Sequence, residues 1–175
     1  MLLRIKQYLN LHARKLFYNA YILPHLDYCC SIWGNCSKEL QNCVVKFQKR
    51  AARIILDKDF EAPSAPLFHE LRWITFPERV DFKKAILIYK TLHDDSTPVY
   101  LRGKFQSSNN TDRNLRSSSN NELKVPKPNL EFFRKSLLYS GPRHWNTIPL
   151  SVRNSENISK FKKAYLQWKF PSSTQ

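Results

Sequence analysis

The stretch SKELQNCVVKFQKRAARIIL, residues 37–56, decides the fold because it has the pattern of one long amphipathic helix. Ser37 is a favoured N-cap residue, and neither Gly nor Pro follows it within the stretch. Apolar residues recur at spacings of four and three, at Leu40, Val44, Phe47, Ala51 and Ile54. This period predicts a helix that turns these side chains toward a core.

A second face of the same helix is predicted to be cationic. With about 100° of rotation per residue, Lys46, Lys49, Arg50 and Arg53 cluster more than about 90° away from the apolar stripe. Cationic helix faces of this kind bind phosphate backbones and carry little sequence information. These four residues are therefore the first candidates for a nucleic-acid-binding surface.

Apolar periodicity predicts further helices on both sides of this stretch. Thr75 and Glu78 have the spacing of a capping box, which opens a helix over 77–93. The remaining expected helices are 2–9, 12–22, 25–33, 130–149 with a break at Gly141 and Pro142, and 158–168. The predicted fold class is mainly α, a helical bundle with a polar loop and a short extended hairpin near 113–127.

The sequence also suggests how the chain is organised. Residues 1–105 are predicted to form a helical region, and 106–128 a polar loop rich in Ser and Asn. Residues 129–170 are predicted to form a C-terminal helical extension that packs on the first region. Residues 171–175 are expected to be a disordered tail.

The composition limits the classes of function. The chain has 175 residues, 42% of them hydrophobic and 25% charged, which is an ordinary globular balance. Only 3 Gly stand against 10 Pro, which disfavours Gly-rich phosphate loops. No apolar run approaches the roughly 20 residues that span a bilayer. We expect a soluble intracellular protein, nuclear or cytoplasmic, with no membrane partner.

The net charge of +15 is the most prominent feature of the composition. Residues 1–60 carry a net charge of +6, residues 61–100 a net charge of −1, and residues 101–175 a net charge of +10. Two basic ends point to polyanionic partners, most commonly nucleic acid. Besides the four residues of 37–56, the candidate contacts are Arg113 and Arg116 in the polar loop and Lys160, Lys162 and Lys163 near Trp168.

Catalytic and metal-binding patterns are weak in this sequence. The cysteines, Cys29, Cys30, Cys36 and Cys43, contain no C-x-x-C pair, so buried free thiols are preferred over a zinc site. His25 and Asp27 have the spacing of an iron site but no distal His, and Asp94-Asp95 has the context of a turn after a helix. We expect no cofactor, no metal and no enzymatic activity of this chain alone.

Several runs, taken in order, resemble the reverse transcriptases of jockey-like non-LTR retrotransposons, directly downstream of the palm. They are ARKLFYNAYILPHLDYCCSIWGNCS, LQNCVVKFQKRAARIIL, TPVYL, RNLRS, VPKPN, SGPRHWNTIP and FKKAYLQW, and together they cover almost the whole chain. The resemblance implies a helical thumb with a C-terminal extension, which grips the template and primer duplex. It also places Tyr28 and Trp33 at aromatic core positions.

The fingers, the palm and the metal-binding aspartates of that family are absent from this sequence. The resemblance therefore implies a non-catalytic, nucleic-acid-binding part of an RNA-directed DNA polymerase. Its partners would be RNA, RNA–DNA or DNA duplexes, together with the palm and fingers of the parent enzyme. The alternative is a helical protein-interaction or structural module without a nucleic-acid role.

Overall fold

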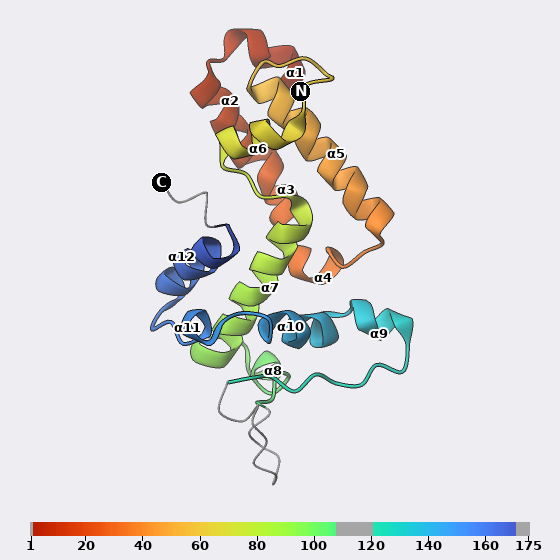
Figure 1. Cartoon of the computed structure of the whole chain (residues 1–175), viewed down its shortest axis with the longest axis vertical. Helices are drawn as coiled ribbons and strands as arrows, with labels where there is room; N and C mark the ends of the chain where they lie inside the picture. Colours follow the sequence, from red (N-terminus) through yellow and green to blue (C-terminus); the bar gives the residue numbers. More distant parts are fainter. Residues whose placement is uncertain (1, 108–120, 171–175) are drawn as a thin grey trace. The chain divides into compact units, whose positions relative to one another are not determined.

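The fold is mainly α, as the sequence predicts. Figure 1 shows the computed structural model, which describes residues 2–107 and 121–170. The helices are α1 (Leu2–Ile5), α2 (Leu11–Phe17), α3 (Leu23–Asp27), α4 (Cys30–Trp33), α5 (Lys38–Ile55), α6 (Ser64–Leu71), α7 (Phe76–His93), α8 (Val99–Arg102), α9 (Glu131–Lys135), α10 (Leu137–Trp145), α11 (Leu150–Arg153) and α12 (Ile158–Lys169).

The chain divides into two compact units, Met1–Arg79 and Val80–Gln175, called unit 1 and unit 2 below. The boundary falls inside α7, because the first turn of this helix packs with unit 1 and the rest with unit 2. The sequence-based division into 1–105, 106–128 and 129–170 stays a prediction.

The N-terminal helices are shorter than predicted. Residues 2–9 form α1 and a 3₁₀ turn, and the expected helix over 12–22 is α2 followed by a π-helical turn at Tyr18–Ile22. The expected helix over 25–33 is split into α3 and α4, because Cys29 adopts a left-handed conformation with φ of 49°. Local backbone geometry therefore interrupts helices that the apolar pattern predicts to be continuous.

The long helix α5 confirms the central prediction from the sequence. It covers Lys38–Ile55, and the Ser37 hydroxyl accepts a hydrogen bond from the Leu40 N–H at 3.4 Å. The start of α7 is also confirmed, since the Thr75 N–H donates to the Glu78 carboxylate at 2.8 Å. This bond is the reciprocal half of a capping box.

The core face of α5 is only partly the one predicted, since Ala51 is buried and Ile54 packs against the core as expected. The buried residues are Gln48, Ala51, Ala52 and Ile55, whereas Leu40 and Phe47 are exposed. Helix α5 packs on α6 and α2, and the small Ala51-Ala52 pair lets the neighbouring helices come close. The remaining buried residues of this core are Leu2, Tyr18, Leu67 and Leu71. The predicted stripe therefore stands partly outside the core.

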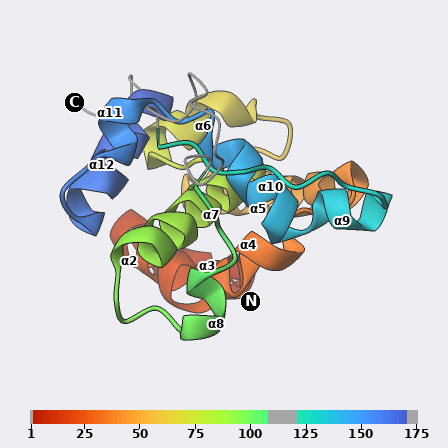
Figure 2. The ribbon, with the colours of Figure 1, turned by 90° about the horizontal axis from the view of Figure 1, so that it is seen from below.

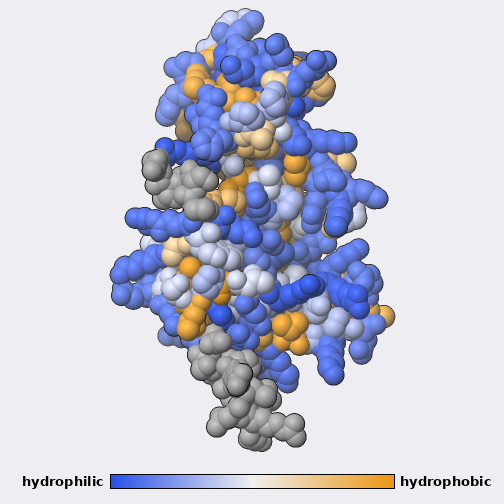
Figure 3. Space-filling view, viewed as in Figure 1, coloured by the Kyte–Doolittle hydropathy of each residue, from blue (hydrophilic) through white to orange (hydrophobic). Residues whose placement is uncertain are grey.

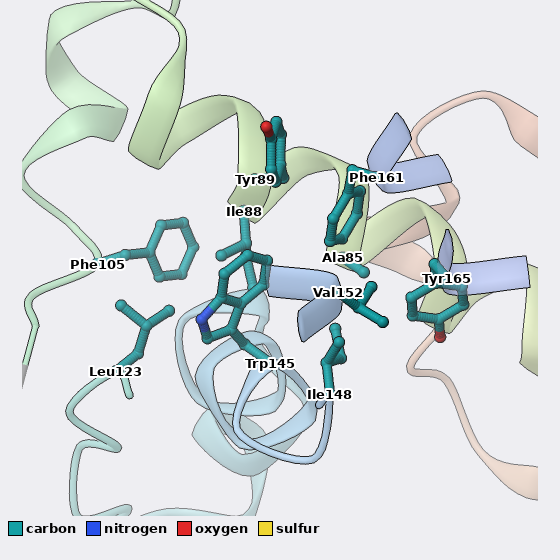
Figure 4. Close-up of a cluster of buried hydrophobic side chains, with 10 residues drawn as sticks. All are labelled: Ala85, Ile88, Tyr89, Phe105, Leu123, Trp145, Ile148, Val152, Phe161 and Tyr165. Carbon is teal, nitrogen blue, oxygen red and sulfur yellow. The ribbon is translucent and has the colours of Figure 1, made fainter. Parts of the chain in front are cut away.

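Unit 2 is built around large aromatic side chains. Figure 4 shows Trp145 of α10 between Phe105 and Leu123 on one side and Phe161 of α12 on the other. The rings of Tyr89 and Phe161 stack with centroids 4.5 Å apart. Helices α11 and α12 lie side by side in both views of the ribbon (Figures 1 and 2).

The predicted break at Gly141 and Pro142 is wrong. Helix α10 runs through both residues, and the chain breaks instead at Ser136, whose backbone is extended. A Cβ added to Gly141 would lie 3.0 Å from the Ile88 side chain, so the absence of a side chain lets α10 pack closely on α7. Tertiary packing outweighs the helix-breaking tendency of the Gly-Pro pair.

The predicted polar loop and hairpin lie largely outside the described residues. Of this region, the structure describes residues 106–107 and 121–128, in which Ser107 and Leu123 form an antiparallel bridge. Asn146 holds Leu123 with two hydrogen bonds of 2.9 Å, one to its N–H and one to its carbonyl. In the parts described, this bridge is the only β pairing.

Candidate nucleic-acid interface

The cationic face of α5 lies opposite its buried face. Residues two positions apart on an α-helix point about 160° away from each other. Lys46 and Arg50 are each two positions from the buried Gln48, so both point away from the core of unit 1. Both side chains are exposed, and that of Lys49 is half-buried. The predicted cationic surface is therefore present on α5.

Three of the four predicted cations are available to a ligand. Within residues 2–107 and 121–170, Lys46, Lys49 and Arg50 form no ion pair or side-chain hydrogen bond. The spacing of Lys46 and Arg50 corresponds to about 6 Å along the helix. Such a row of cations favours contacts with phosphates over contacts with bases.

Arg53 differs from the other three because it is held by its own unit. Its Nε donates to the Ala62 carbonyl at 2.9 Å, and its guanidinium lies 5.7 Å from the centroid of the Phe60 ring. The side chain is half-buried. We therefore infer that Arg53 mainly stabilises the segment that follows α5 and contributes less than the other three cations to any phosphate contact.

An apolar groove of about 490 Å³ adjoins the cationic face. It lies between α1, the turn Tyr18–Ile22 and α5, and Arg4 and Arg50 are its two cationic lining residues. Phe47, which is 48% exposed, and Tyr21 also line it. Figure 3 shows one mostly hydrophilic face of the molecule, with hydrophobic side chains gathered in small patches.

Arg4 is a residue of this surface that the sequence analysis did not single out. No signal in the sequence could have found it, because only the packing of α1 beside α5 brings Arg4 and Arg50 to one groove. The groove also corrects the prediction that Phe47 packs in the core.

The second predicted group lies on α12. Lys162 and Lys163 are exposed, and among the described residues neither has an ion-pair partner. Lys160 pairs with Glu156, four residues earlier, which lowers its net contribution to a cationic surface. At the end of the helix, Lys169 lies 5.5 Å from the centroid of the Trp168 ring. Lys162 and Lys163 are the stronger candidates on this helix.

The remaining predicted contacts, Arg113 and Arg116, lie outside the described residues, as does the predicted tail 171–175. The structure therefore places seven of the nine predicted residues, four on α5 and three on α12. Since α5 belongs to unit 1 and α12 to unit 2, each group is considered as a separate surface.

The residues that imitate catalytic motifs have structural roles. Asp27 forms a bidentate ion pair with Arg79, which raises the pKa of the Arg79 guanidinium. Asp94 accepts hydrogen bonds from the Ser96 hydroxyl and N–H, which lower the pKa of its carboxyl group. The turn at Asp94 agrees with the sequence-based expectation, and Asp27 serves in an ion pair.

The aromatic and thiol predictions near α4 need correction. Tyr28 is 76% exposed, so it is not a core residue, and Trp33 is partly exposed while stacking on Phe76 at 5.0 Å between centroids. Among the cysteines, all four are free thiols, but only Cys30 is buried. The left-handed Cys29 turns the chain here, which leaves Tyr28 outside the core.

No helix in the described parts of the chain combines the length and the apolar character needed to cross a bilayer. Comparisons with protein-family models, with curated proteins and with solved structures found no match. The function is therefore argued from the residues and their arrangement.

Proposed function

We propose that this chain is a non-catalytic nucleic-acid-binding module that contacts the phosphate backbone through the cationic face of α5. In this proposal it corresponds to the thumb and C-terminal extension of a jockey-like non-LTR retrotransposon reverse transcriptase. It works inside the cell, in the nucleus or cytoplasm, on RNA, RNA–DNA or DNA duplexes. The chemistry of polymerisation belongs to the palm and fingers of the parent enzyme.

The observation that carries the proposal is the position of Lys46, Lys49 and Arg50. Lys46 and Arg50 point away from the buried residues of α5, and the half-buried Lys49 lies at the edge of this face. No acidic partner within the described residues neutralises the three. Cations placed in this way release counterions when they meet phosphates, so affinity depends steeply on salt. The net charge of +15 adds a general attraction that speeds encounter with a polyanion.

The test is the binding of a fluorescent RNA–DNA duplex, followed by anisotropy over a series of salt concentrations. The triple variant Lys46→Glu, Lys49→Glu and Arg50→Glu should bind on the order of 10- to 100-fold more weakly near 0.1 M salt. Its plot of log affinity against log salt should be shallower by about 2 to 3, one for each lost phosphate contact. Circular dichroism should show an unchanged helix content.

A matched control separates a defined face from net charge alone. Lys104, Lys124 and Lys127 are exposed lysines of unit 2 that lie outside the predicted contacts. Reversing all three to Glu changes the charge by the same amount and should weaken binding much less. An equal loss in the control would show that α5 is not the interface, and no salt-dependent binding by the wild type would refute the proposal.

The second candidate is a protein-interaction module, favoured by the apolar groove beside α5. Large exposed side chains such as Tyr21 and Phe47 are found at interaction surfaces more often than on isolated monomers. In the parent enzyme this partner would be the palm. Wild-type protein should then capture a fingers–palm fragment of a jockey-like polymerase, and Phe47→Asp should lose it. No capture by a monomeric, stable wild type would count against this candidate.

A further inference from the structure

Arg153 is a buried arginine whose hydrogen-bonding capacity is mostly unused. The residue ends α11 and is 5% exposed. Its Nη1 donates to the Asn121 carbonyl at 3.0 Å, while its Nε is buried and has no acceptor. No carboxylate in residues 2–107 or 121–170 forms an ion pair with it.

This arrangement is unfavourable for a positive charge. Burial lowers the pKa of the Arg153 guanidinium, and the field of Glu122 acts in the opposite direction without an ion pair. A buried charge normally has a counter-ion and a full set of hydrogen bonds. The guanidinium carries five N–H donors, so the Asn121 carbonyl satisfies only a small part of its capacity.

The local structure does not need this charge to hold its shape. The Asn121 carbonyl also accepts a hydrogen bond from the Trp145 indole at 3.3 Å. The Asn121 side chain donates to Asn154 at 2.9 Å. The Asn146 side chain forms hydrogen bonds with both the N–H and the carbonyl of Leu123. A neutral side chain at position 153 would leave these contacts in place.

A small pocket of about 170 Å³ lies beside Arg153. Leu92, Leu123 and Trp145 form its apolar walls, and His93, Ser107 and Asn121 its polar ones. None of its lining residues among those that the structure describes is a carboxylate. At about 30 Å³ for each water molecule, the volume holds about five waters, which is room for one tetrahedral oxyanion.

We propose that this pocket binds a small oxyanion with phosphate chemistry through the guanidinium of Arg153. Arginine forms charge-assisted and often bidentate hydrogen bonds to phosphate oxygens. The anion supplies the missing counter-charge and acceptors. The oxyanion could be free phosphate or the terminal phosphate of a nucleic-acid strand, which share this chemistry. Only the strand terminus rests on the function proposed above.

The first experiment follows the Trp145 indole signal of the ¹⁵N-labelled full chain during a titration with inorganic phosphate, against sodium chloride of equal ionic strength. Because Trp145 lines the pocket, its indole N–H signal should shift and saturate. The signals of Trp33 and Trp73, which belong to unit 1, should stay in place. The thermal midpoint should rise with phosphate, since a ligand of the folded state stabilises it.

The variants Arg153→Met and Lys162→Met separate the pocket from general charge. Arg153→Met keeps a long apolar side chain but removes the charge, and it should abolish the saturable shift. Lys162→Met removes an exposed cation of α12 and should keep the shift. The proposal is overturned if the wild-type Trp145 signal does not respond to phosphate, a result that needs no variant. A full response in folded Arg153→Met would overturn it equally.

A second titration assigns the source of the oxyanion. A short oligonucleotide with a 5′-phosphate is compared with the same oligonucleotide carrying a 5′-hydroxyl. A larger Trp145 shift with the 5′-phosphate supports the strand terminus, and a response to inorganic phosphate alone supports the free ion. Duplex binding by the α5 face is measured separately by anisotropy, so failure of either proposal leaves the other testable.

Discussion

The two units use their large apolar side chains differently. In unit 2, the rings of Trp145, Phe161 and Tyr165 are almost completely buried and form one continuous core. In unit 1, the core uses Ala51 and Ala52 at the contacts of α5, and larger side chains remain exposed. Unit 1 also buries Tyr18 and Phe76, and unit 2 also exposes Phe132, so the difference concerns the core contacts of α5. The exposed apolar side chains beside α5 leave surface for a partner.

The electrostatics of the two units differ in the same way. Lys46 and Arg50 of α5 are exposed on an open face, while Arg153 of unit 2 is buried beside a pocket. Open cations suit an extended polyanion, which they meet one phosphate at a time. A buried guanidinium beside a pocket suits a single small anion, because burial weakens the screening of its charge by solvent.

The largest expected effect comes from truncating matched phenylalanines in the two units. Phe161→Ala empties a site that is 0% exposed in the unit 2 core, and it should cost about 3 to 5 kcal/mol of unfolding free energy. Phe47→Ala removes a side chain that is 48% exposed and should cost about 1 kcal/mol or less. Urea unfolding followed by circular dichroism measures both.

Phe132→Ala is the control within unit 2, because this ring is 85% exposed. It should change the unfolding free energy by less than about 0.5 kcal/mol. If Phe47→Ala were as costly as Phe161→Ala, Phe47 would belong to a core, and the contrast between the units would disappear.

The periodicity of the sequence predicts some of these features well. The mainly α fold, the bounds of α5 within about a residue or two, and the cap at Ser37 follow from residues close together in the chain. The cationic face follows as well, since charge on a helix is a local pattern. These features depend on the helix alone, which is why a single sequence reveals them.

Features that depend on distant contacts could not be predicted. The buried face of α5 is set by α2 and α6, which select Gln48 and Ala52 over Leu40 and Phe47. The continuation of α10 through Gly141 depends on Ile88 of α7. The burial of Arg153 has no signal in the sequence at all, because a lone arginine near a Pro-capped short helix has the pattern of a surface residue.

A pH-dependent effect is expected from His144 in unit 2. Its Nε2 lies 2.9 Å from the Tyr165 hydroxyl, and burial lowers the pKa of the imidazole below its usual range. Lys84 and Lys169 act in the same direction, and Asp81 opposes them. As the pH falls below about 6.5, the unfolded chain takes up a proton that the folded chain does not, so stability is lost toward acid.

The slope from this one group is at most about 1.4 kcal/mol per pH unit. His144→Gln should reduce the loss of unfolding free energy between neutral pH and about pH 5, measured by urea unfolding at each pH. His69→Gln, which replaces an exposed histidine of unit 1, is the control. An unaltered profile in His144→Gln would show that other groups carry the acid sensitivity.

The smallest expected effect compares the N-caps of α5 and α12. The Asn157 side chain accepts from the Lys160 N–H at 2.8 Å, while Ser37 accepts from the Leu40 N–H at 3.4 Å. Asn157→Ala should cost about 1 kcal/mol and Ser37→Ala about 0.5 kcal/mol, because the longer bond is the weaker one. Urea unfolding of both variants measures the difference. A larger loss for Ser37→Ala would mean that unit 1 depends more strongly on the start of α5 than its partly exposed core suggests.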